Sequence, residues 1–265
     1  MQLAHRVSLN GQELDGIDSR IIIKGIEEAA GKESISTVSY GSRDGQRVTN
    51  TRRDYVEVSV SFSLNIRRND LQERSDIFEK VNRWAAGGGW LKVNYKNNRR
   101  IYVICTQAPG AGDQWKRMNE YTITFRAYGV PYWQQETESA LRIQNISSLS
   151  NRAIGVEGSA RTVMNMEFKN TSGSTADTFS ITAAGNTFSF TSLGLGNGET
   201  LVIDHTAEGV LRIRIRNTGG GYRSAYSKRT TGSADELFLS PGTNYVSMSS
   251  QRAGTLTISY AGRFV

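Results

Sequence analysis

The residue types that carry most enzyme chemistry are scarce in this sequence. It contains two histidines, His5 and His205, and one cysteine, Cys105. A nucleophile–histidine–acid arrangement would have to use one of these histidines. His5 lies among the first residues, and His205 stands between Asp204 and Thr206, where a turn or capping role is expected. We interpret Cys105 as a buried small apolar residue, so the sequence offers no catalytic triad.

Metal and nucleotide sites also lack support. A zinc site needs three or four nitrogen and sulfur ligands, which one cysteine and two histidines cannot supply. A carboxylate-only calcium site at Asp204, Glu208 or Asp113 stays open, but the sequence contains no loop with the ligand spacing of a calcium site. The glycines at 87–89 follow a predicted helix, the reverse of a dinucleotide-binding fingerprint, and no glycine run ends in Gly-Lys-Ser/Thr. We therefore expect no metal, no cofactor and no enzymatic activity, although only the fold can show whether two carboxylates meet as in a glycosidase.

The composition indicates a folded protein with many strands and turns. Charged residues make up 22% and hydrophobic residues 37% of the 265 residues, with 27 glycines and three prolines. No apolar run reaches the roughly 18 residues of a membrane span, and no signal peptide is evident. The net charge of +7 divides into +4 for residues 1–136 and +3 for residues 137–265. Nucleic-acid binders usually concentrate such charge on one element.

The first half predicts a β-sandwich with one helix. Residues 55–66 alternate strictly, with valines, Phe62 and Leu64 on one face and serines on the other, as expected of a strand with one buried face. Asp70 and Glu73 have the spacing of a capping box, and an apolar stripe follows, so a helix is expected over 70–85. Further strands are expected at 90–95, 100–108 and 119–128.

A polar, basic segment at 41–54 precedes the alternating strand. Asp44-Gly45 is a tight-turn signal, so we expect a projecting β-hairpin or long loop with its tip near Gly45. Short strands at 19–23 and 36–40 are expected around a polar insert at 27–33. The serine face of the alternating strand, which includes Ser59, Ser61 and Ser63, is small and flat enough to contact another chain, with simple solvent exposure as the alternative.

The second half is rich in Ser, Thr, Gly and Asn and has no helix signal. A proline-bearing segment at 129–138 marks the boundary, giving domains of residues 1–136 and 137–265. Regularly spaced strand patterns predict a two-sheet sandwich at 163–169, 178–182, 187–190, 199–204, 209–216, 244–249 and 255–260. Residues 211–216 alternate apolar residues with three arginines. Aromatic and basic residues interleave at 222–229, which leaves nucleic-acid or carbohydrate contact open.

The order and spacing of these elements resemble the distal tail (Dit) family of long-tailed, siphovirus-type bacteriophages and prophages. In the first half the resemblance rests on the basic hairpin, the alternating strand, the helix ending in Val81-Asn82-Arg83-Trp84, and the segments 90–93, 100–103, 121–125 and 131–133. Segments 198–204 and 239–244 look like the family's C-terminal galectin-like sandwich. The resemblance covers essentially the whole chain.

The resemblance implies a mainly β fold, with a tail-tube-like N-terminal β-sandwich and a galectin-like C-terminal one. It also implies a structural hub of the phage tail tip or baseplate, assembled in the bacterial host cytoplasm and found in the virion. Family members form a homo-hexameric ring, sometimes paired, that joins the tail tube to tail-tip, receptor-binding or other baseplate proteins. DNA passes through the ring channel without sequence-specific binding, and no membrane is involved.

A closed ring needs two different patches on each subunit. The hairpin is a natural arm for reaching a neighbour, and the serine face is a natural platform. The candidate intersubunit contacts are therefore Arg43, Arg47, Arg52, Arg53, Ser59, Ser61 and Ser63. The alternative for the arginines is a mobile, solvated loop. Alternatives for the whole chain are a tail-tube subunit, which would usually lack the second sandwich, and a carbohydrate-binding adhesin or receptor-binding tail component.

Overall fold

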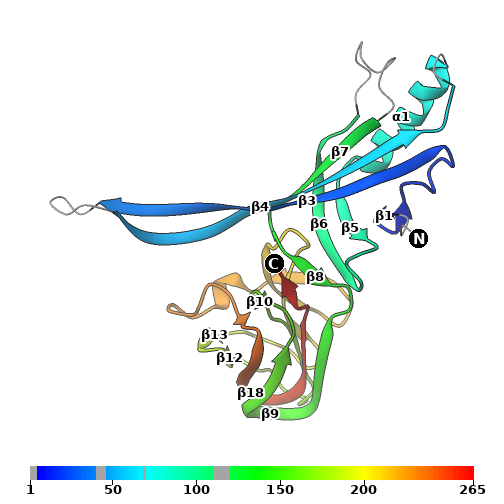
Figure 1. The fold of residues 1–265 in the computed structure, drawn as a ribbon. Helices are drawn as coiled ribbons and strands as arrows, with labels where there is room; N and C mark the ends of the chain where they lie inside the picture. The colour runs from blue at the N-terminus through cyan, green and yellow to red at the C-terminus, as the bar shows by residue number, and fades with distance from the viewer. Residues whose placement is uncertain (1–4, 40–45, 68–69, 110–119) are drawn as a thin grey trace. The chain divides into compact units, whose positions relative to one another are not determined.

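The computed structural model describes residues 5–39, 46–67, 70–109 and 120–265. The chain is mainly β and divides into two compact units, Met1–Trp133 and Gln134–Val265 (Figure 1). Short strand β8 (Trp133–Gln135) lies at the boundary between them. No helix in the described part of the chain is long and apolar enough to cross a membrane.

The first unit is a curled antiparallel sheet with one helix. Its strand order is β2-β1-β5-β6-β7-β4-β3. The elements are β1 (Val7–Leu9), β2 (Gln12–Glu13), β3 (Ile21–Ser39), β4 (Gln46–Leu64), α1 (Leu71–Ala85), β5 (Gly89–Val93), β6 (Arg99–Gln107) and β7 (Glu120–Ala127). The curl occurs at β6, which pairs with β5 through residues 101–103 and with β7 through residues 104–107.

The core of this unit is built as the alternation predicts. Val56, Val58, Val60 and Phe62 of β4 are buried, while the residues between them are half-buried on the outer face. Helix α1 begins where the capping box places it, because the Asp70 carboxylate accepts the backbone N–H of Glu73 at 3.0 Å. The expected strand and helix of this region are confirmed.

The helix also buries one charged residue on its apolar face. The side chain of Arg74 is 2% exposed. It lies three and four residues before Ile77 and Phe78, so it shares their buried face. Its guanidinium donates to the hydroxyl of Tyr121 in β7 and lies over that ring, which compensates its burial.

The predicted hairpin is longer than expected. Strands β3 and β4 are each continuous over 19 residues (Figure 1). Residues 46–55 of β4, which precede the segment paired with β7, pair with β3 alone. The prediction of two short strands around a polar insert at 27–33 is therefore wrong. The backbone N–H and C=O groups of the polar insert form hydrogen bonds with β4, whatever side chains the insert carries. Because both faces of this ribbon are exposed or half-buried, the segment can form a strand without an apolar face. We call residues 32–39 and 46–54 the arm. The expected tip near Gly45 lies outside the described residues.

The second unit is a sandwich folded from one continuous sheet and a β10–β17 ribbon. The sheet order is β13-β12-β18-β11-β14-β15-β16, with β9 also paired to β18. The elements are β9 (Ser139–Val156), β10 (Thr162–Val163), β11 (Asn165–Asn170), β12 (Phe179–Ala183), β13 (Asn186–Phe190), β14 (Thr200–His205), β15 (Leu211–Arg216), β16 (Tyr222–Ser224), the 3-10 turn η1 (Tyr226–Lys228), β17 (Phe238–Leu239), β18 (Gly242–Tyr260) and β19 (Arg263–Phe264).

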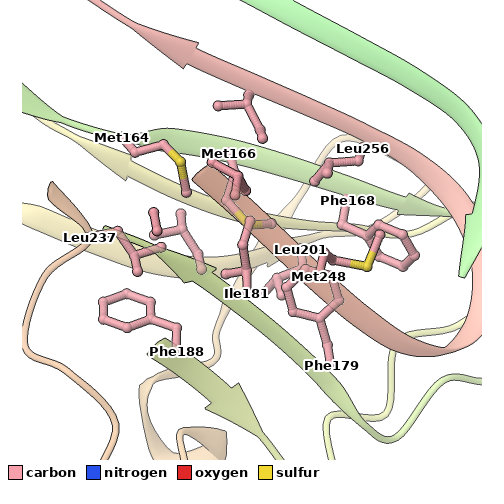
Figure 2. Close-up of a cluster of buried hydrophobic side chains, with 14 of the residues drawn as sticks. Met164, Met166, Phe168, Phe179, Ile181, Phe188, Leu201, Leu237, Met248 and Leu256 are labelled. Carbon is pink, nitrogen blue, oxygen red and sulfur yellow. The ribbon is translucent and has the colours of Figure 1, made fainter. Parts of the chain in front are cut away.

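Strand β18 carries the sheet from one layer to the other. Its residues 246–250 pair with β12, and its residues 254–259 pair with β11. The switch is at Gly254, where a Cβ would fall on the Lys169 carbonyl oxygen and the Phe168 ring. The two layers enclose a core of aromatic, aliphatic and methionine side chains that includes Phe168, Phe179 and Phe188 (Figure 2).

Two features of this unit differ from the strand pattern in the sequence. Residues 244–249 and 255–260 belong to one bent strand rather than two. Strand β9 pairs with β18 along its length but was not predicted. Its apolar residues Leu141, Ile143, Ile146 and Leu149 are separated by two or three positions, so they give no regular alternation.

Candidate assembly surfaces

Three of the seven proposed contact residues, Arg47, Arg52 and Arg53, lie on the arm. Arg47 is exposed on β4 opposite Val38. Arg52 is exposed and pairs with Asp54 at 3.1 Å, and Asp54 also accepts the hydroxyl of Ser34 across the ribbon. Arg43 lies outside the described residues.

Arg53 lies at the root of the arm and packs inward. Its guanidinium lies 5.4 Å from the centre of the Tyr132 ring and reaches the carbonyl of Pro131 at 3.5 Å. Its side chain also fills the space beside Gly31, where a Cβ would collide with it. Arg53 therefore fixes the arm to residues 131–132, and Arg47 and Arg52 are the exposed arginines of the described arm.

Sequence reasoning missed the apolar residues of the arm. Ile35, Val48 and Val38 are 60%, 54% and 48% exposed. Ile35 pairs with Thr51, and a register shift after Ser36 brings Val48 opposite Thr37, so Ile35 and Val48 share one face. Val38 lies on the other face. Apolar side chains on a ribbon without a core gain stability only when another surface covers them. The sequence does place these three apolar residues close to the predicted polar turn at 41–46, where apolar side chains would not be expected to reach a core.

The serine face forms hydroxyl pairs with β7. Ser59 lies 3.5 Å from Thr124 and Ser61 lies 3.4 Å from Thr122, oxygen to oxygen, while Ser63 is buried opposite Glu120. These short side chains keep the outer face of β4 and β7 flat. Its serines are half-buried or buried within the unit.

At the end of this face next to the arm, the side chains are larger and some are charged. Arg126 donates to Glu57 at 2.7 Å and stacks over the Tyr55 ring at 4.8 Å. Tyr55 also contacts Tyr128, with ring centres 5.7 Å apart. The hydroxyl bond of Tyr128 and the carboxylate of Glu57 together raise the pKa of Arg126, so this side chain stays charged. A flat hydroxyl surface bordered by this cluster can pack against a neighbouring chain but holds no reacting group.

The surroundings of His205 and Cys105 do not favour catalysis. His205 accepts or donates at Nδ1 with the Asn165 side chain at 2.9 Å, and burial lowers its pKa to about 4, so it is neutral at physiological pH. Cys105 is half-buried, less than expected, and burial raises the pKa of its thiol, which leaves it a weak nucleophile. Within the described ranges, no three His, Cys, Asp or Glu side chains gather to hold a metal ion.

The arginine ladder of β15 is compensated within the sheet. Asp204 accepts from Arg212 and, at 2.9 Å, from Arg214, while Arg216 pairs with Glu167 at 2.9 Å. Arg214 also stacks over Tyr222 at 4.2 Å. The three cations are thus held by strands β11 and β14 rather than presented together to a polyanion.

These features define a class of mainly β protein with two compact units, a curled sheet that carries one helix and a long arm, and a β-sandwich. The chain has the fold of the Dit protein (gp 19.1) of phage SPP1, described as a paradigm of the hub adsorption apparatus in phages infecting Gram-positive bacteria. That crystal structure matches with a TM-score of 0.69 over 99% of this chain and 100% of that chain, at 12% identity. The resemblance to the Dit fold is confirmed, including the galectin-like second half.

A second solved structure is also similar. A chain of the phage P2 baseplate, in its activated conformation with Ca, matches with a TM-score of 0.50 at 10% identity over 99% of this chain and 100% of that chain. No family model and no curated protein matches the sequence itself. The similarity to these two structures is therefore a similarity of fold.

Proposed function

We propose that this protein is a structural hub of a phage tail tip or baseplate and has no catalytic role. The observation that carries the proposal is the match to the SPP1 hub protein along both chains in full. Two unrelated sandwiches in one chain would match only in part, so agreement over 99% of the chain supports the same architecture. The flat hydroxyl face of β4 and β7 and the exposed arm are also suited to contacts with other proteins, as a structural component of a tail would need.

We further propose that six copies form a ring around a DNA channel, with the arm reaching the next subunit. The described outer arm of β3, residues 32–39, spans about 26 Å at roughly 3.3 Å per strand residue. That length is sufficient to cross onto a neighbour. The exposed Ile35 and Val48, with Arg47 and Arg52, supply apolar and charged groups for the contact. The flat face that includes Ser59 and Ser61 is the proposed platform, whereas Ser63 is buried within the unit opposite Glu120 rather than on the contact surface.

The ring would join the tail-tube protein to tail-tip, receptor-binding or other baseplate proteins in the virion. Its first unit would surround the DNA, and its second unit would lie outside and bind the neighbouring components. The domain roles, ring-forming for residues 1–136 and partner-binding for residues 137–265, belong to the same proposal. A tail-tube subunit is less well supported, because the matched hub chain is covered in full, second sandwich included.

Negative-stain electron microscopy and native mass spectrometry of the full chain test the ring. Six-fold particles with a central hole, at six times the mass of the chain, are expected. Monomers at high concentration would contradict the ring. Deleting residues 42–50 is expected to leave a folded protein that does not form rings, and unchanged rings would contradict the role of the arm.

A further inference from the structure

A hollow of about 490 Å³ lies on the second unit, on the sheet face opposite the core. Its eight lining residues are all polar or charged. They come from strands β9, β11, β14, β15 and β18 and from Thr171 just after β11. Core residues such as Phe168 and Leu256 alternate with them along the same strands and point the other way.

The strand register explains why these side chains converge. Thr255, Lys169, Thr200 and Arg216 are paired in succession across β18, β11, β14 and β15, so they form one row on one face. In the next row, Arg142 of β9 pairs with Thr257, and Thr257 pairs with Glu167. The hollow thus has a threonine floor with basic side chains from three strands around it.

The charges around the floor are not balanced. Arg216 is bound by Glu167 through two hydrogen bonds of 2.9 and 3.3 Å. Among the described residues, no ion pair joins Arg142 or Lys169 to a carboxylate, and both side chains are exposed. Two positive charges therefore border a surface of hydroxyl groups without a compensating anion.

We propose that this hollow binds an acidic polysaccharide, a hydroxyl-rich chain that bears carboxylate or phosphate groups. Arg142 and Lys169 would pair with the anionic group, and Thr200, Thr255 and Thr257 would exchange hydrogen bonds with ligand hydroxyls. No aromatic ring or apolar side chain is among the lining residues, so the anchors typical of protein partners are missing. The same lack disfavours a neutral sugar held by ring stacking. The inference goes beyond the hub role and does not depend on it.

Isothermal titration calorimetry of the full-length protein tests the site. The probes are polygalacturonate as a carboxylate polymer, poly(glycerol phosphate) as a phosphate polymer, dextran as a neutral polymer and poly-glutamate as an acidic peptide. We expect saturable, salt-sensitive binding to one or both anionic hydroxylated polymers. The double variant R142A/K169A should bind at least tenfold more weakly. The control R152A removes an exposed arginine from the same strand β9, away from the hollow, and should bind as the unmodified protein does.

Several results would overturn the proposal. Failure of all probes to bind, equal binding of dextran, or equal loss of affinity in R152A would each do so. Tighter binding of poly-glutamate would assign the hollow to an acidic protein segment instead. Circular dichroism of each variant verifies the fold. Ring formation is measured separately by native mass spectrometry, so failure of this site and failure of the hub role are distinguishable.

Discussion

Arg74 of helix α1 and Tyr121 of strand β7 meet inside the first unit, where the guanidinium donates to the tyrosine hydroxyl. Arg74 is 2% exposed, so its charge depends on partners within the protein. The Tyr121 ring also packs edge-on against Phe78, with ring centres 4.8 Å apart. This polar contact thus connects the helix to the sheet next to the aromatic side chains of the core.

Removing the Tyr121 hydroxyl should destabilise the first unit. Y121F keeps the ring but withdraws an acceptor from a buried cation, at a cost of about 2 kcal/mol in unfolding free energy. All four tryptophans lie within residues 84–133, so tryptophan fluorescence in urea reports on this unit. Y95F, at a half-exposed tyrosine, is the matched control and should change the midpoint little. Equal midpoints for the two variants would contradict the role of this contact.

Asp18 should make the stability of the first unit sensitive to acid. Its buried carboxylate accepts from Arg20 and from Lys80 of α1 at 2.9 Å, and Arg20 holds the Asp18 pKa well below its usual range. A lowered folded-state pKa contributes stability above the unfolded pKa of about 3.9 and loses it as pH falls toward the folded value.

The variant D18N tests this linkage. At pH 7 we expect D18N to lower the unfolding free energy by about 2 kcal/mol, because Arg20 and Lys80 lose a charged acceptor. The difference from the unmodified protein should shrink below about pH 4, where the unfolded carboxyl takes up its proton. Urea titrations from pH 7 to pH 3 measure it, with D76N on the exposed helix face as control. A difference that stays constant with pH would refute the linkage.

The apolar residues of the arm should govern assembly rather than folding. In I35E/V48E both exposed side chains of one arm face become charged, which should raise the concentration needed for assembly by at least about tenfold. The fluorescence midpoint in urea should be unchanged, because neither residue contributes to the core. N50E, on the opposite face of the arm, is the control. Analytical ultracentrifugation measures the assembly, and unaltered assembly of I35E/V48E would exclude this face as the contact.

Gly254 should be intolerant of any side chain. In G254A the new methyl group meets the Lys169 carbonyl and the Phe168 ring at the bend of β18, at a cost of about 2 kcal/mol or more. G155A is the matched control, since its Cβ would meet nothing within 4 Å. Differential scanning calorimetry of the full chain should show a lower transition temperature for G254A only. Similar transitions for both variants would mean that the bend accommodates a side chain.

Local patterns in the sequence were sufficient for the elements whose signals are contained in a few neighbouring residues. The period-2 alternation of β4 and the Asp70 cap of α1 depend on backbone geometry within one element, so both were predicted. The order of such elements was also enough to indicate the Dit fold. The residue types also limited the chemistry to consider, because two histidines and one cysteine allow few catalytic arrangements that use these side chains.

The tertiary structure decided the features that depend on distant strands. The full lengths of β3 and β9 depend on pairing with β4 and β18, which satisfies their backbones and cannot be read from neighbouring residues. Arg74 is buried because a hydroxyl 47 residues away compensates it. The outer hollow likewise exists only through the register of five strands, which brings Arg142, Lys169 and Arg216 together from three parts of the chain. The sequence specifies the chemical type of each side chain, whereas the pairing of strands distant in the sequence determines which side chains lie next to each other.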